Sequence, residues 1–149
     1  MRAVLLAAAV VLVSQAVSAR AEIITRCGAS SGQGWYFASP FVPQDEVGWN
    51  EDAISKGGFL LIVDDDKPDI VTTDVAGTRS SRADGALAIF VPGTKSGFRV
   101  VLLVYPAGTV EHFLFQLDRA GNGTVAWGTV RGGGLFQKSS LFVAKCRAP

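Results

Sequence analysis

The sequence predicts an all-β fold: an antiparallel barrel or sandwich of about eight strands, with one short helix and termini tied by a disulfide. Three observations support this prediction. Short runs rich in β-branched and aromatic residues recur along the chain, and Gly, Pro, Asp and Asn separate them. The connections are short, which favours antiparallel pairing because a parallel crossover needs about a dozen residues or more. Two cysteines stand one near each end, as a single covalent clasp requires.

Residues 1–21 predict a cleavable signal peptide. The chain starts with the positive pair Met1-Arg2 and continues with an unbroken apolar run from Ala3 to Val13. Small residues then precede two cleavage positions, after Ala19 or after Ala21. The apolar run is shorter than the roughly 20 residues that a membrane span needs. We therefore expect a periplasmic or secreted protein, with no membrane insertion after cleavage.

The mature part, residues 22–149, is long enough for one hydrophobic core and too short for two ordinary domains. The full chain carries 14 Lys and Arg against 13 Asp and Glu. Arg2 and Arg20 leave with the signal peptide, so 12 basic and 13 acidic side chains remain, a net charge of −1. This balance provides no basic surface for nucleic acid. No polybasic or strongly amphipathic segment predicts binding to a membrane surface.

Eight strands are predicted in the mature part. Turn sequences such as Pro92-Gly93 and Gly121-Asn122-Gly123 lie between them and supply the backbone angles that tight reversals need. The predicted strands are Ile23 to Cys27, Phe59 to Val63, Asp69 to Thr73, Ala86 to Val91, Phe98 to Tyr105, Thr109 to Leu117, Thr124 to Val130 and Leu141 to Cys146.

The predicted strand from Thr109 to Leu117 has two distinct faces. Glu111 shares one face with Phe113, Phe115 and Leu117, whereas the other face carries Val110, His112, Leu114 and Gln116. The strand from Phe98 to Tyr105 is apolar on both faces except at Arg99. A strand that is apolar on both sides is expected to be covered on both sides, by a helix, by a partner chain or by closure into a barrel.

One short helix is predicted after residue 50. Asn50 is a suitable N-cap, Glu51 and Asp52 would occupy the first turn, and Gly57 would end the helix after Lys56. The preceding segment, Gly28 to Gly48, reads as irregular, because it is glycine-rich, then aromatic, then bracketed by prolines. Long irregular segments in compact domains often carry function.

Cys27 and Cys146 are the only cysteines. In an oxidising compartment they are expected to form a disulfide that ties the first strand to the last. Two free thiols or an intermolecular pair are the alternatives. Their spacing suits neither a zinc site nor a redox Cys-x-x-Cys pair.

A serine-hydrolase mechanism is the enzymatic alternative. Gly28-Ala29-Ser30-Ser31-Gly32 matches the G-x-S-x-G pattern, but the residues that follow it have no helical pattern, which the nucleophile elbow requires. His112 is the only histidine and would have to act as the base for Ser30 or Ser31. We favour a protein without enzymatic activity.

No metal site or cofactor is predicted. The one acidic cluster, Asp64-Asp65-Asp66 followed by Asp69, lacks the glycine and the distal glutamate of a calcium-binding EF-hand. A solvated hairpin turn explains it, and calcium binding there is the alternative.

The aromatic residues around the irregular segment are the predicted binding contacts. Trp35, Tyr36 and Trp49 lie at its two ends, and together they would line a pocket or patch for a protein or a small apolar ligand. Filling of the core is the alternative role for these side chains.

Several short motifs carry a family resemblance. These are Cys27-Gly28 with its serine and glycine turn, Tyr36-Phe37, and Lys138-Ser139-Ser140-Leu141-Phe142 before Cys146. In them the chain resembles a group of small secreted proteins of Gram-negative bacteria. The resemblance spans nearly the whole mature chain, and the group brings no known activity, so it implies no functional residue.

Three functions follow from these observations. The first is a periplasmic or secreted binding module for a protein or a small apolar ligand. The second is the small serine hydrolase that uses Ser30 or Ser31 with His112. The third is a structural β module that forms a homodimer by burying the second apolar face of the strand from Phe98 to Tyr105.

Overall fold

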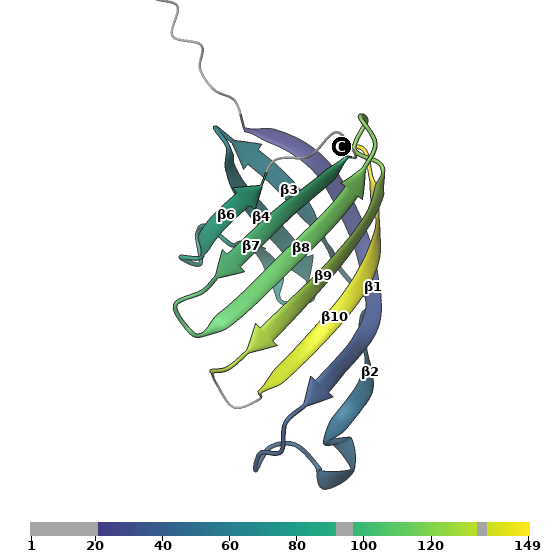
Figure 1. Ribbon diagram of the computed structural model, residues 1–149, viewed down its shortest axis with the longest axis vertical. Helices are drawn as coiled ribbons and strands as arrows, with labels where there is room; N and C mark the ends of the chain where they lie inside the picture. Colours follow the sequence, from purple (N-terminus) through teal and green to yellow (C-terminus); the bar gives the residue numbers. More distant parts are fainter. Residues whose placement is uncertain (1–20, 92–96, 134–136) are drawn as a thin grey trace, which may run out of the picture.

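The computed structural model describes residues 21–91, 97–133 and 137–149. Ten strands form one antiparallel sheet in the order β5-β4-β3-β1-β10-β9-β8-β7-β6, and β2 pairs with β1 beside this path (Figure 1). The strands are β1 (Glu22–Tyr36), β2 (Gly48–Ile54), β3 (Gly58–Asp64), β4 (Lys67–Asp74), β5 (Gly77–Ser80), β6 (Leu87–Val91), β7 (Phe98–Val104), β8 (Thr109–Leu117), β9 (Gly123–Arg131) and β10 (Lys138–Arg147). The all-β prediction is confirmed, and each of the eight predicted strands overlaps a strand of the sheet; β2 and β5 were not predicted. The predicted signal peptide, apart from Ala21, lies outside the described residues.

The sheet curls into a half-barrel. In Figure 1 the strands β7 to β10 cross the front of the molecule, and β3 and β4 lie behind them. The two wings approach each other at β4 and β6, which lie close together but are not neighbours in the pairing order. Within the described residues, no helix is long and apolar enough to cross a membrane.

The long first strand organises the sheet. One edge of β1 pairs with β10 along most of its length, and the other edge pairs first with β3 and then with β2. The register with β10 shifts between Cys27 and Ser30, as at a β-bulge. Bulges bend a strand and increase its twist, so this irregularity helps the sheet to curl.

The predicted helix after residue 50 is wrong. Gly48–Ile54 is the strand β2, with Trp49 paired to Trp35 and Ile54 paired to Ser30. The Asn50 amide donates to the carbonyl oxygen of Glu46 at 2.7 Å and caps no helix. A two-turn helix has little stability of its own, whereas the exposed edge of β1 offers a full ladder of hydrogen bonds. A three-residue 3-10 turn, Gln44–Glu46, is the only helical element in the described parts of the chain.

The prediction of an irregular segment from Gly28 to Gly48 is also wrong for its first half. β1 continues to Tyr36, so only residues 37–47 form the loop that leads into β2. Gly32 in this stretch serves close packing, because a Cβ there would overlap the backbone carbonyl oxygen of Leu141 on β10.

The predicted disulfide between Cys27 and Cys146 is confirmed. The two residues face each other in the ladder between β1 and β10, so the first and last strands are neighbours in the sheet. Both cysteines are buried and belong to the hydrophobic core.

The core fills one end of the half-barrel. Phe115, Leu61 and Val101 are fully buried there, and the Thr25 hydroxyl closes this end by bonding the carbonyl oxygen of Gly121 at 2.6 Å. Phe113, Trp127 and Phe142 stack toward the other end of the concave side, with 5.5 Å between the first two ring centroids and 4.4 Å between the last two.

Candidate functional site

The concave side of the half-barrel contains a cavity of about 440 Å³. It lies between the wing of β3 to β5 and the wing of β7 to β9, at the end of the sheet where β4, β7 and β9 finish. Ligand sites in proteins are typically clefts of about 300–1,000 Å³, so this cavity has the size of a site for a small organic molecule.

The floor of the cavity is apolar and aromatic. Phe59, Ile70, Phe113 and Trp127 line it from four different strands. Phe59 meets Phe113 and Trp127 edge-on, with ring centroids 5.3 and 5.9 Å apart. The Trp127 indole N–H donates to the Ser30 hydroxyl at 3.1 Å, which holds the indole ring in place. This floor is preformed, because its side chains are held by one another and by the sheet.

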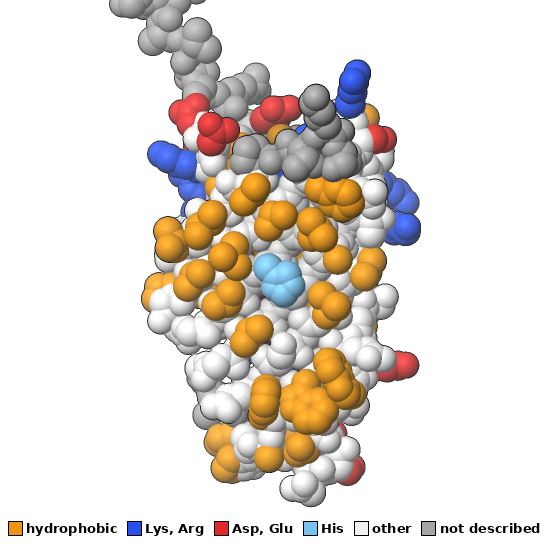
Figure 2. Space-filling view, viewed as in Figure 1, with side chains coloured by type: hydrophobic (Ala, Val, Ile, Leu, Met, Phe, Trp, Pro, Cys, Tyr) orange, Lys and Arg blue, Asp and Glu red, His pale blue; other side chains and the backbone are white. Residues whose placement is uncertain are grey.

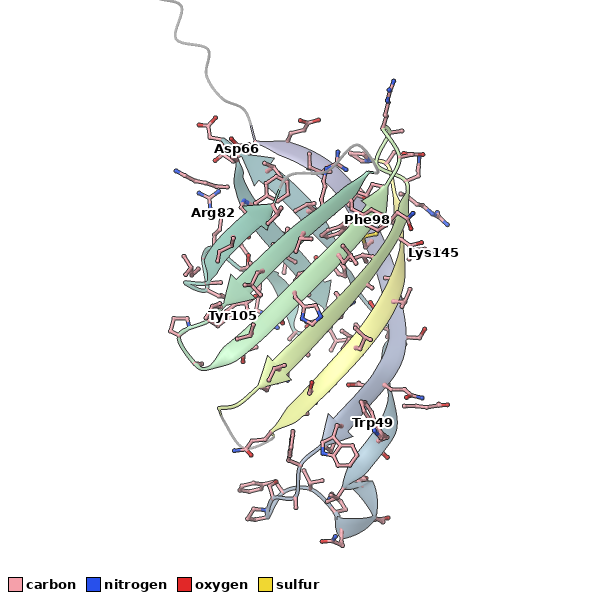
Figure 3. The ribbon with its side chains drawn as sticks, in the orientation of Figure 1. Trp49, Asp66, Arg82, Phe98, Tyr105 and Lys145 are labelled. Carbon is pink, nitrogen blue, oxygen red and sulfur yellow. A yellow bond between two sulfur atoms is a disulfide. The ribbon has the colours of Figure 1, made fainter. Side chains whose placement is uncertain are left out.

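A polar pair stands at the open end of the cavity. Tyr105 follows β7 and its hydroxyl donates to the Glu111 carboxylate on β8 at 3.1 Å. Figure 3 shows Tyr105 at the end of β7, beside the β7–β8 turn. That turn is closed by the Gly108 N–H, which bonds the carbonyl oxygen of Tyr105 at 3.1 Å.

The environment of this pair raises the pKa of both side chains. Burial raises the pKa of Glu111, against the lowering effects of the Tyr105 hydrogen bond and the Arg131 and Arg79 charges. Burial also raises the pKa of Tyr105, and the nearby Glu111 charge raises it further. Tyr105 therefore remains a hydrogen-bond donor at physiological pH, and burial disfavours the charged form of Glu111.

Four further charged residues line the cavity. Arg79 forms an ion pair with Asp74 at 3.7 Å, and the Arg79 side chain is largely exposed. Asp84 and Arg131 are exposed as well. Exposed pairs of this kind contribute at most about 1 kcal/mol to stability, so these residues set the charge of the opening more than they hold the fold.

A second polar cluster extends along the concave face toward β2. Lys138 Nζ lies 2.7 Å from the Asp52 carboxylate, and the Ser140 hydroxyl donates to the same oxygen at 2.9 Å. Burial alone would raise the pKa of Asp52, but the hydrogen bonds from Lys138 and Ser140 and the Lys138 charge outweigh it and lower that pKa. Lys138 and Ser140 therefore both bind the Asp52 carboxylate. We interpret this cluster as structural.

The convex face is apolar over seven neighbouring strands, β1, β2 and β6 to β10. Figure 2 shows its orange side chains around a single histidine, with no acidic or basic side chain among them. His112 lies at the centre of this face, over Gly128, where an added Cβ would overlap the imidazole ring. We call this region the outer apolar face. Its exposed large side chains are Trp35, Trp49, Leu87, Ile89, Val91, Val104, Leu114, Val130, Leu141 and Val143.

The structure divides the three aromatic residues predicted as binding contacts between the two faces. Trp35 and Trp49 pack edge to face on the convex side, with ring centroids 5.6 Å apart, and both are exposed. Tyr36 is on the concave side beside Lys138, whose Nζ lies 5.2 Å from the Tyr36 ring centroid. None of the three lines the cavity. Figure 3 shows Trp49 near the lower end of the sheet, away from Tyr105. Their role in binding stays a prediction.

The residues of the serine-hydrolase hypothesis are not brought together. Ser30 is buried on the concave side, whereas His112 is exposed on the convex side. Ser31 shares the convex side with His112, but β10 and β9 separate their strands. Three strand spacings of about 4.8 Å place Ser31 far beyond hydrogen-bond reach of the imidazole. The hypothesis thus loses the contact on which it depends.

The acidic residues 64–66 form the hairpin turn between β3 and β4. Asp65 and Asp66 both have positive φ, as the central residues of a type I′ turn require. Asp64 approaches Arg82 at 3.6 Å, and Asp69 accepts hydrogen bonds from Ser80 and Ser81. No group of three or more potential metal ligands is present in residues 21–91, 97–133 and 137–149.

Of the residues that line the cavity, only Ser30 was a candidate from the sequence, as a possible nucleophile. The signal for one of them was present, since the alternation of β8 places Glu111 on the same face as Phe113 and Phe115. A carboxylate on an otherwise apolar strand face is unusual, because a buried charge is costly unless it is paired. The contributions of Arg79 and Asp84 had no such signal, because they reach the cavity from the other wing.

Comparison with known proteins does not identify a family. The chain matches no protein-family model, no curated protein and no solved structure. The resemblance to small secreted proteins of Gram-negative bacteria therefore stays a prediction.

Proposed function

We propose that this protein is a secreted or periplasmic binding module that holds a small amphipathic molecule inside its half-barrel. The cavity carries the proposal, because it combines an apolar aromatic floor with a hydrogen-bonding pair, Tyr105 and Glu111, at its open end. An apolar ligand body would be buried against Phe113 and Trp127, and its polar end would reach the pair. Sites of this kind gain affinity from apolar burial and orientation from a few polar groups. The Cys27–Cys146 disulfide suits an oxidising compartment.

A neutral fluorescent probe tests this proposal. N-phenylnaphthylamine is expected to bind and to brighten, and replacing Thr72 by phenylalanine is expected to weaken its binding by about tenfold or more, about 1.4 kcal/mol. Thr72 lies on β4 and lines the cavity, so a larger side chain there occupies the ligand volume. The measurement is a fluorescence titration of the protein with its disulfide intact.

Thr73→Phe provides the matched control. Thr73 is the next residue on β4, is exposed and does not line the cavity, so its variant should bind the probe as the unchanged protein does. Equal binding by both variants would place the probe on another surface, and no binding at all would contradict the proposal directly.

The outer apolar face supports a second candidate function, self-association. Its eight aliphatic and two tryptophan side chains expose on the order of 500 Å² of apolar surface, if each aliphatic residue is about half exposed. Each partner of a standard protein interface buries about 800 Å², so this apolar surface would supply more than half of one side of such an interface. The patch around His112 in Figure 2 is apolar, and Glu51 lies on the side of β2 that carries Trp49, so we propose that a second copy of this chain covers the apolar patch. Two such sheets would pack face to face about 10 Å apart.

Replacing Leu114 by arginine is expected to abolish this association. Leu114 lies on β8 within the outer apolar face, and an unpaired charge buried there would weaken a dimer by about 100-fold or more. Analytical ultracentrifugation over a range of concentrations measures the effect. Val75→Arg, in the exposed β4–β5 turn, is the control that should associate normally. A monomeric mass of the unchanged protein at millimolar concentration would eliminate this candidate.

A further inference from the structure

We propose that the cavity selects small organic cations, with the ligand's ammonium group placed at Glu111 and its apolar body on the aromatic floor. This inference rests on the proposed function and adds the chemical class of the ligand. Three features of the cavity support it: its charge balance, the incomplete pairing of Glu111, and the aromatic faces beside that carboxylate.

The charge balance of the lining favours a cation. Asp74, Asp84 and Glu111 line the cavity against Arg79 and Arg131, which gives a net charge of −1 when Glu111 is ionised. An ammonium group makes the loaded cavity neutral, whereas a carboxylate or phosphate adds to the excess negative charge. Arg79 pairs with Asp74, and both arginines are exposed at the rim, so their charges act on Glu111 only from a distance.

Glu111 is a partly buried carboxylate that the charges of Arg131 and Arg79 reach only from a distance. No basic side chain of the described chain lies within ion-pair distance of it, and its one hydrogen bond comes from Tyr105. A carboxylate has about four acceptor positions, so most of its capacity remains open. Its cross-strand neighbours are Leu103 and Thr129, which cannot neutralise it. Burial raises the pKa of Glu111 more than the Tyr105 hydrogen bond and the two arginine charges lower it, so the carboxylate is incompletely compensated.

A second unpaired polar group lies beside this carboxylate. The Thr129 hydroxyl is buried, with the residue only 2% exposed, and it has no hydrogen-bond partner within the described chain. Thr129 is directly opposite Glu111 in the ladder between β8 and β9. A hydroxyl can donate as well as accept, and Thr129 does not line the cavity, so the preference for a cation rests on Glu111 and the aromatic floor.

The aromatic floor adds a further attraction for a cation. Phe113 follows Glu111 by two residues on the same face of β8, and Phe59 and Trp127 line the same cavity. The faces of aromatic rings attract ammonium groups that lie within about 6 Å of the ring centroid. The same rings bury an apolar ligand body, so the site would accept both parts of one small hydrophobic amine.

Three ligands of one shape test the inference: phenylpropylamine, phenylpropanol and phenylpropanoate. Calorimetric titration is expected to give the tightest binding for the amine, about tenfold or more tighter than for the alcohol, with the carboxylate weakest. Glu111→Gln is expected to remove the preference of the amine over the alcohol while leaving alcohol binding within about threefold. Glutamine keeps the size of the side chain and can still accept from Tyr105.

Glu51→Gln is the matched control, because it makes the same substitution at an exposed glutamate that does not line the cavity. It should preserve the order of the three ligands. The amine preference should also decline as the pH falls and Glu111 takes up a proton, and this decline should be absent in the Glu111→Gln protein. The titratable groups that share the cavity with Glu111 are Asp74, Arg79, Asp84, Tyr105 and Arg131, whereas His112 points to the opposite face.

The outcomes separate this inference from the proposed function. If the three ligands bind equally, or if the carboxylate binds best, cation selection is overturned while the cavity remains a binding site. If Glu51→Gln removes the preference as fully as Glu111→Gln does, the assignment to Glu111 is wrong. If neither these ligands nor N-phenylnaphthylamine bind, the proposed function itself fails.

Discussion

Replacing both Cys27 and Cys146 by alanine is expected to lower the free energy of unfolding by about 2–5 kcal/mol. The bond spans 119 residues of sequence, so it removes a large amount of conformational freedom from the unfolded chain. In the chain-entropy account a loop of about 100 residues corresponds to roughly 4.7 kcal/mol. It joins the central strands β1 and β10 next to the β1 bulge, where the backbone ladder is interrupted.

Urea denaturation of three samples measures this effect: the oxidised protein, the protein after reduction, and the double alanine variant. The reduced protein and the variant should unfold at similar, lower urea concentrations. A loss below about 1 kcal/mol in both would mean that loop closure stabilises this fold little. A loss in the variant alone would assign the effect to packing of the sulfur atoms and not to the bond.

Gly32→Ala is expected to destabilise the protein by about 3 kcal/mol or more, or to prevent folding. A Cβ at this position would overlap the backbone carbonyl oxygen of Leu141 and lie 2.8 Å from the Phe142 Cα. Both atoms belong to the backbone of β10, so no side-chain rotation can relieve the overlap. Separating β1 from β10 would break the ladder at the centre of the sheet.

Gly28→Ala is the control for this variant. Gly28 belongs to the same strand, but a Cβ there meets no atom within 4 Å, and its backbone has no positive φ. Alanine at position 28 should leave stability unchanged or raise it by up to about 1 kcal/mol, because it restricts the unfolded chain. Equal behaviour of the two variants in urea denaturation would contradict the close approach of β1 and β10.

The stability of the sheet and the position of the cavity are connected through these residues. The tight contact at Gly32 and the clasp at Cys27 hold β1 against β10, and β1 also carries β3 on its other edge. This arrangement joins the wing that supplies Phe59 to the wing that supplies Trp127. Loss of either feature should therefore reduce ligand binding as well as stability.

Sequence reasoning was accurate where the signal is local. The two-residue period of β8 separated Phe113 and Phe115 from His112 and Leu114, and the structure places these sets on opposite faces. The pairing of Cys27 with Cys146 followed from their number and from an oxidising compartment. The sequence also showed that both faces of β7 are apolar. The expected cover is present on the inner face, whereas no part of the single chain covers the outer face.

It was inaccurate where a distant strand decided the outcome. The Asn50 to Gly57 segment has the local features of a short helix, but the free edge of β1 recruits it as the strand β2. β1 likewise continues through glycines that read as a loop, because β10 and β2 pair with it on both sides. Local preferences of this size are weaker than a complete ladder of backbone hydrogen bonds.

The sequence by itself determined the all-β class, most strands, the disulfide and the two faces of each strand, because these depend on spacing over a few residues. Only the tertiary structure decided which faces enclose a cavity and which remain exposed. The curl of the sheet brings Arg79 and Asp84 from one wing beside Tyr105, Glu111 and Arg131 from the other. It also leaves Trp35 and Trp49 on the convex side, away from that cavity. Such convergence depends on strand order and curvature, which join residues far apart in the chain and leave no periodic mark in the sequence.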